Sequence, residues 1–131
     1  MWEAYDIRDE KCLWGALGFT GGIAGNQAAP CGALPGAVVA LGFHHSCDLK
    51  QKEEAKKRRL AIRADADALF KSFVNRFGAI SCRELVGLDF TIPTEYQKFQ
   101  AGVWKEKCNH FVEFIIRKLY ELEGVRDGGK A

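Results

Sequence analysis

Cysteine is the residue type in this chain with the most versatile chemistry, because its thiolate can act as a nucleophile, a redox group or a metal ligand. The chain has five cysteines, and two of them, Cys31 and Cys82, lie where helices are predicted to begin. Unpaired N–H groups and the helix dipole at such positions favour a thiolate over a thiol. We therefore expect Cys31 and Cys82 to be better nucleophiles and better metal ligands than an ordinary cysteine.

Cys108 differs from these two, because it lies on the apolar stripe of the predicted last helix. If the two helix starts abut that stripe, then Cys31, Cys82 and Cys108 converge on one site with a redox or ligand role. The alternative is that all three pack as small hydrophobic residues, since free cysteine is among the most buried residue types. No C-x-x-C sequence is present, so neither a thioredoxin-type pair nor a zinc ribbon is predicted.

The remaining cysteines, Cys12 and Cys47, give weaker signals. Cys47 follows His44 and His45 at the end of the predicted second helix. His45 is fourteen residues from Cys31, which is about 21 Å along a continuous helix, so a shared site within one subunit is not expected. We interpret His44, His45 and Cys47 as a helix C-terminus with favourable dipole placement.

A glycine-rich connection precedes Cys31. It contains Gly18, Gly21, Gly22 and Gly25, and two further glycines, Gly32 and Gly36, follow the cysteine. Loops of this kind ahead of helices can bind anions, but the spacing matches neither the dinucleotide fingerprint nor the P-loop. We interpret these glycines as allowing close packing of the loop against the cysteine region, with a small-molecule site at the loop as a further alternative.

The elements that must position these residues are helices. Apolar residues recur at helical spacing and few runs alternate with period two, so we predict an all-α fold. The prediction is a compact bundle of about five helices, with the glycine-rich loop between the first two. The expected helices cover residues 3–17, 30–46, 48–77, a short stretch closed by Gly87, a second short stretch near Thr94, and residues 103–123.

Helix-start signals support several of these boundaries. Pro30 occupies a position typical of a first helical residue, and Asp48 is a good N-cap. Ser81 and Glu84 have the spacing of a capping box. The strongest apolar periodicity is in the last helix, where one stripe comprises Trp104, Cys108, Phe111, Val112, Ile115, Leu119 and Leu122.

Length and charge narrow the classes of protein. The 131 residues fit one domain over residues 1–131, with a disordered tail at 124–131, and the net charge of +2 argues against nucleic-acid binding. Six basic and two acidic residues fall within 50–59, a composition typical of a solvated helix face. No segment has the length of a membrane span, and the N-terminal residues lack a signal-peptide pattern, so we expect a cytoplasmic protein.

Three segments together resemble a family of redox-active proteins named for a C_GCAxxG_C_C pattern. They are residues 18–23 (GFTGGI), residues 31–42 (CGALPGAVVALG) and residues 77–87 (FGAISCRELVG), with Cys108 completing the pattern. The resemblance covers residues 13–123, and split-Soret cytochromes carry a similar domain. The family's first cysteine lies well upstream of the glycine loop, and here that region is missing, with Cys12 too close to the loop to replace it.

The resemblance implies a small helical domain whose grouped cysteines, here Cys31, Cys82 and Cys108, are redox-active or hold a metal. Three cofactor alternatives remain open: an iron–sulfur cluster, zinc, or no cofactor. A redox partner protein and a homodimer are the expected partners. The alternative function is a non-catalytic helical interaction module whose cysteines belong to the core and whose basic residues 50–59 form the contact surface.

Overall fold

Helices form nearly all of the regular structure in this computed structural model, which describes residues 4–128, with side chains up to residue 123. In chain order, the elements are α1 (Lys11–Ala16), the 3-10 helix η1 (Leu17–Phe19), α2 (Ala33–His44), α3 (Lys52–Phe77), α4 (Cys82–Val86), α5 (Pro93–Lys98), the π-helix η2 (Phe99–Val103), α6 (Trp104–Glu106) and α7 (Cys108–Gly128). Within the described residues, β structure is limited to one isolated bridge. The predicted all-α fold is confirmed.

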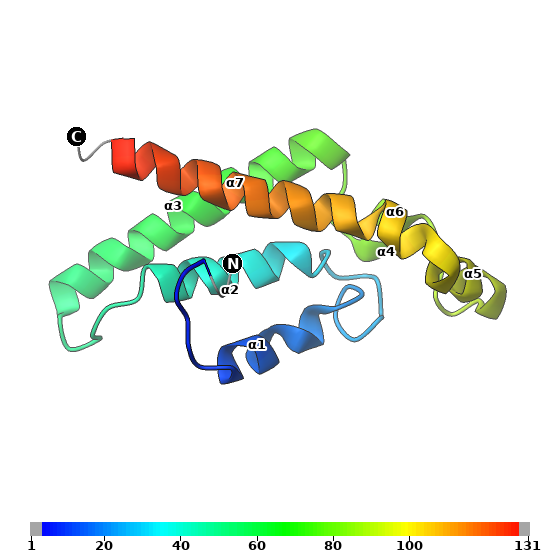
Figure 1. The fold of residues 1–131 in the computed structure, drawn as a ribbon, viewed down its shortest axis with the longest axis horizontal. Helices are drawn as coiled ribbons and strands as arrows, with labels where there is room; N and C mark the ends of the chain where they lie inside the picture. Colours follow the sequence, from blue (N-terminus) through cyan, green and yellow to red (C-terminus); the bar gives the residue numbers. More distant parts are fainter. Residues whose placement is uncertain (1–3, 129–131) are drawn as a thin grey trace.

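The core lies where α2, α3 and α7 pack against one another (Figure 1). Its most deeply buried side chains include Leu41 of α2, Leu69 and Phe73 of α3, and Leu119 of α7, each no more than 1% exposed. Apolar residues at helical spacing bring these side chains to the shared interior. The predicted stripe of the last helix is confirmed at Phe111, Ile115 and Leu119, whereas it is wrong at Trp104 and Val112, which are 39% and 45% exposed.

The glycine loop lies between the first two helices, as predicted, but the first helix is much shorter than expected. It covers Lys11–Ala16 instead of residues 3–17, and residues 4–10 form turns and irregular backbone. Its apolar residue Trp14 and the following Leu17 are 72% and 51% exposed. Exposed apolar side chains contribute little to helix stability, which explains the short first helix.

Three other helix boundaries differ from the prediction. The second helix begins at Ala33, and Pro30 lies outside it in the β-bridge. The third begins at Lys52, because the Asp48 side chain accepts a hydrogen bond from Lys50 N (2.9 Å) in a turn and does not cap the helix. The last helix continues through Gly124 to Gly128, while residues 129–131 of the predicted tail lie outside the described residues.

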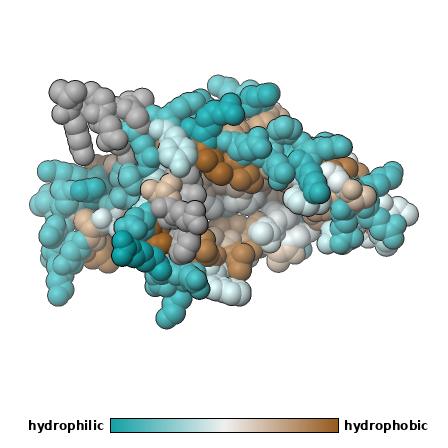
Figure 2. Space-filling view, in the orientation of Figure 1, coloured by the Kyte–Doolittle hydropathy of each residue, from teal (hydrophilic) through white to brown (hydrophobic). Residues whose placement is uncertain are grey.

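The short elements α4, α5, η2 and α6 gather at one end of the structure, to the right of the main helices in Figure 1. Gly102 interrupts the regular helix there, with non-helical backbone angles inside η2. Figure 2, in the orientation of Figure 1, shows hydrophobic side chains over the central part of the visible face and hydrophilic side chains around it. None of the helices in the described part of the chain combines the length and apolar character that crossing a membrane requires.

Candidate functional site

The isolated β-bridge between Pro30 and Ser81 positions two of the cysteines. Cys31 N donates to Ile80 O (2.7 Å), and Cys82 N donates to Ala29 O (3.2 Å). Cys31 and Cys82 each follow a bridged residue. The bridge therefore holds the two segments that carry these cysteines side by side.

The predicted capping box fixes the start of α4 at Cys82. Ser81 Oγ accepts a hydrogen bond from Glu84 N (3.3 Å) and donates to Glu84 Oε1 (2.8 Å). Cys82 is therefore the first residue of its helix, as the sequence predicted. Cys31 lies two residues before the first residue of α2, because that helix begins later than expected.

Cys108 also lies at a helix start, which differs from its predicted place inside a continuous helix over 103–123. The chain turns at Lys107, between α6 and α7, and Cys108 is the first residue of α7. Lys107 Nζ donates a hydrogen bond to Val86 O (2.7 Å), which ties this turn to the end of α4. Sequence periodicity did not reveal Lys107, because a lysine in a helical run is usually solvated.

Cys31, Cys82 and Cys108 line one cavity of about 700 Å³. The cavity is bounded by the glycine loop, the starts of α2, α4 and α7, and the aromatic residues Phe90, Tyr96, Phe99 and Phe111. Of the three cysteines, Cys82 is buried and the other two are partly buried. The structure thus brings together the three cysteines that the sequence analysis selected.

Burial controls the protonation of these thiols. Burial raises the pKa of Cys31, and a hydrogen bond from the Ala33 backbone lowers it by less. Burial likewise raises the pKa of Cys82, and a hydrogen bond from the Gln27 side chain lowers it by less. Burial, followed by repulsion from Cys31 and then Cys82, raises the pKa of Cys108 to about 11. The expectation that the helix starts produce thiolates is wrong, because desolvation outweighs the favourable backbone interactions.

These pKa shifts predict slow alkylation of Cys108 with a steep pH dependence. With a pKa of about 11, only about one Cys108 thiol in a thousand is ionised at pH 8. We expect its reaction with iodoacetamide to accelerate about tenfold per pH unit from pH 8 to 10, since the thiolate is the reacting form. Peptide mass spectrometry of a Cys12→Ser/Cys47→Ser variant would measure this rate, and a plateau below pH 9 would contradict the prediction.

The glycine loop packs directly against the cysteine region, as we interpreted it. Gly21, Gly22 and Gly25 have φ of +64°, +66° and +77°. A Cβ on Gly22 would lie 2.9 Å from Cys82 Cβ and 2.8 Å from Ala29 O. Gly22 is therefore required by both its backbone conformation and its close contacts.

The other glycines of the sequence prediction have unequal roles. Gly32 precedes α2, and a Cβ there would lie 2.7 Å from Phe19 O, so it also permits a close approach. A Cβ on Gly18 or Gly36 would meet no atom within 4 Å. Gly18 does not end the first helix, because it lies in η1, where its carbonyl accepts a hydrogen bond from Ala24 N (3.0 Å).

Gln27 is a site residue that the sequence analysis missed. Its side chain is fully buried, with Nε2 donating to Leu88 O (2.8 Å) and Oε1 accepting from Phe90 N (2.8 Å). Nε2 also lies 4.0 Å from Cys82 Sγ. One amide thus joins the glycine loop to the 88–90 segment beside a cysteine, and no local sequence pattern indicates such long-range partners.

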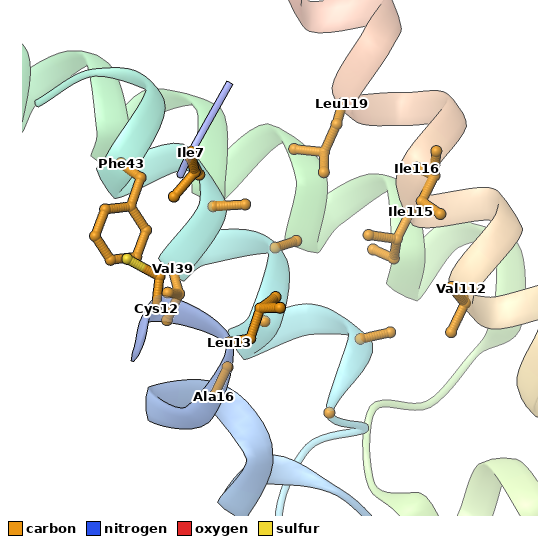
Figure 3. A pocket seen from close by; sticks show the side chains of 15 residues that line it. Ile7, Cys12, Leu13, Ala16, Val39, Phe43, Val112, Ile115, Ile116 and Leu119 are labelled. Atoms are coloured by element: carbon orange, nitrogen blue, oxygen red, sulfur yellow. The ribbon is translucent and has the colours of Figure 1, made fainter. Parts of the chain in front are cut away.

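Cys12 lies in a separate, smaller cavity of about 310 Å³ between α1, α2 and α7 (Figure 3). Cys12 and Phe43 lie on one side of this cavity, with Val112 and Leu119 of α7 across from them. The two cavities share the wall formed by Gly32, Ala33 and Val112. Cys12 therefore lies in the adjacent cavity and does not line the three-cysteine cavity. Cys47 lines neither of the two cavities.

The predicted helix end at His44 and His45 has an additional role. His45 is 5% exposed, and its Nε2 lies 3.0 Å from Oδ2 of the buried Asp65 on α3. His44 stacks on Tyr5, with ring centroids 4.4 Å apart. These histidines connect helices at a distance from the cysteine cavity, and they do not join it.

The cysteine arrangement can be compared with the needs of a metal. Among the described side chains, no group of three or more His, Cys, Asp or Glu residues is arranged to hold a metal ion. The described cysteines all carry free thiols. The donor set for the iron–sulfur cluster or zinc that the resemblance implies is therefore not assembled in this arrangement, and no step below involves either.

The all-α fold and the three cysteines around one cavity define a small helical protein with grouped thiols. The family model described as "Putative redox-active protein (C_GCAxxG_C_C)" matches residues 1–122, and the chain belongs to this family. Comparisons with curated proteins and with solved structures gave no match.

Proposed function

We propose that the protein is a thiol redox protein in which Cys31, Cys82 and Cys108 act as a group. The observation that carries this proposal is that three segments far apart in the sequence contribute one cysteine each to a single open cavity. Repulsion between the charged forms of the three thiols contributes to the raised pKa values of Cys82 and Cys108, which supports treating them as one group. Core packing alone does not require an open cavity at three cysteines.

Within this group, we assign the reversible disulfide to Cys31 and Cys82. They flank the same bridge, and both line the cavity. Cys108 has its pKa raised to about 11, which makes it the least ready of the three to act as a thiolate. The Cys31–Cys82 dithiol would exchange with a disulfide of a redox partner protein, which receives both electrons and both protons as its own disulfide becomes a dithiol.

The test is an anaerobic redox titration of the full chain in glutathione buffers, with thiols counted by mass spectrometry. We expect one two-electron transition, with a slope of about 30 mV per tenfold change in the ratio of oxidised to reduced protein. Cys31→Ser and Cys82→Ser should each abolish it, whereas the matched controls Cys12→Ser and Cys47→Ser should retain it. Five thiols that titrate independently, with no intramolecular disulfide, would overturn the proposal.

A non-catalytic interaction module is not favoured as the alternative, given the family and the open cavity. Our further proposals are a single domain, a cytoplasmic location and a homodimer. The exposed apolar residues of α1, including Trp14 at 72%, support a dimer, since such surface is often covered by a partner. The basic residues 50–59 are the proposed contact surface for a redox partner protein.

A further inference from the structure

The three-cysteine cavity has the dimensions of a small-molecule site. Its volume of about 700 Å³ lies within the range of ligand pockets, which are lined mainly by apolar and aromatic side chains. One wall is an aromatic cluster of Phe90, Tyr96 and Phe99, with ring centroids 4.5 to 6.3 Å apart. Tyr96 and Phe99 are stacked within 19° of parallel, a wall suited to a flat ring.

The described lining of this cavity includes no charged side chain and no histidine. Three amides of the glycine loop are already engaged, because Ile23 N, Ala24 N and Gly25 N donate to the carbonyls of Phe19, Gly18 and Thr20. An anionic ligand would therefore lose its hydration without gaining a cation or these amides. The cavity favours an uncharged ligand.

The remaining polar groups indicate what that ligand carries. Tyr96 belongs to the lining, and its hydroxyl can donate a hydrogen bond to a carbonyl oxygen, whereas the Thr20 hydroxyl already donates to Leu17 O (3.1 Å). The thiols of Cys31 and Cys82 hold two removable hydrogens in the same cavity. A flat ring with two carbonyl oxygens, which can take up these two hydrogens and accept from the Tyr96 hydroxyl, fits both the aromatic wall and these groups.

We propose that the cavity binds an uncharged quinone, which serves as the two-electron oxidant of the Cys31–Cys82 dithiol. The proposal rests on the redox function proposed above and names a substrate for the same site. Two S–H bonds break and one S–S bond forms, while each quinone oxygen gains one electron and one proton to give the hydroquinone. Because electrons and protons leave together, no charge remains in the apolar cavity.

The test uses duroquinone, whose ring carries four methyl groups and so has no free position for addition of a thiol. We expect anaerobic reduced protein to convert one duroquinone to hydroquinone for each disulfide formed. A Cys31→Ser/Cys82→Ser variant should still bind duroquinone saturably, measured by quenching of tryptophan fluorescence. Anthraquinone-2-sulfonate, which is anionic, should bind at least tenfold more weakly.

Substitutions of the aromatic residues test whether duroquinone binds in this cavity. Phe90→Leu should weaken duroquinone binding at least tenfold, and the more exposed Tyr96→Leu provides a second variant if Phe90→Leu fails to fold. Phe70→Leu on α3 is the matched control, since Phe70 is 44% exposed and does not line the cavity. Equal affinity in the cavity variants and the Phe70→Leu control would overturn the proposed site.

The two proposals fail in distinguishable ways. A dithiol couple without duroquinone binding would overturn the quinone site and leave the thiol redox function standing. Saturable binding without a dithiol couple would overturn the oxidant role together with the redox function.

Discussion

Gly22→Ala is expected to lower the free energy of unfolding by about 3 kcal/mol, combining the cost of a side chain at positive φ with that of overpacking. The new Cβ would lie 2.8 Å from Ala29 O and 2.9 Å from both Cys82 Cβ and Gln27 Cα. Two of these contacts are backbone atoms, so rotation of a side chain cannot relieve them. Urea unfolding followed by circular dichroism would measure the loss.

Gly36→Ala is the matched control for this substitution. Gly36 lies inside α2, and a Cβ there would meet no atom within 4 Å. Alanine in a helix is favoured over glycine by up to about 1 kcal/mol, so this variant should be at least as stable as the parent. Equal losses in both variants would contradict the close packing at Gly22.

Gly22→Ala should also alter the cysteine site. Relief of the contact with Cys82 Cβ requires Cys82 to move, which changes its position relative to Cys31. The midpoint potential of the proposed couple should therefore shift in Gly22→Ala and stay constant in Gly36→Ala. If the Gly22→Ala protein were destabilised but its midpoint potential were unchanged, the packing of the loop would not influence the redox couple, which would contradict this prediction.

Asp65→Ala is expected to cost about 2–3 kcal/mol, because it removes one partner of a buried hydrogen bond to the His45 ring. Asp65 and His45 are 9% and 5% exposed, with 3.0 Å between Oδ2 and Nε2. The pair connects the end of α2 to α3, so its loss should also loosen the core helices. Thermal unfolding would show a midpoint several degrees lower, as expected for a loss of this size.

Asp67→Ala on the same helix provides the control. Asp67 forms an exposed i,i+4 ion pair with Lys71, and its side chain is 59% exposed. Such pairs contribute about 0.3–0.5 kcal/mol, so this variant should be nearly as stable as the parent. If both aspartate variants lost the same stability, burial would not explain the role of Asp65.

Much of the fold could be predicted from the sequence. The helix positions followed from apolar periodicity, and the capping box at Ser81 and Glu84 placed Cys82 correctly. Errors occurred where tertiary contacts override local signals. Asp48 has the residue type of an N-cap, but its carboxylate forms a turn with Lys50, and the helix begins four residues later.

The sequence was sufficient to group the three cysteines, but the ionisation of their thiols could not be predicted from it. Residue type, helix starts and the family pattern selected Cys31, Cys82 and Cys108, which line one cavity. Their raised pKa values depend on burial, which no local pattern records. Gln27 was missed for the same reason, because both partners of its amide lie in a distant segment of the chain.

The contacts of Gln27 also have a consequence for the order of folding. Its bonds to Leu88 O and Phe90 N close loops of 61 and 63 residues, whereas α2 and α3 are consecutive helices that pack against each other. Loop-closure entropy delays distant contacts relative to neighbouring ones. We therefore expect the cysteine cavity to assemble late, so that a chain emerging from the ribosome carries dispersed thiols until residues 80–90 have docked on the glycine loop.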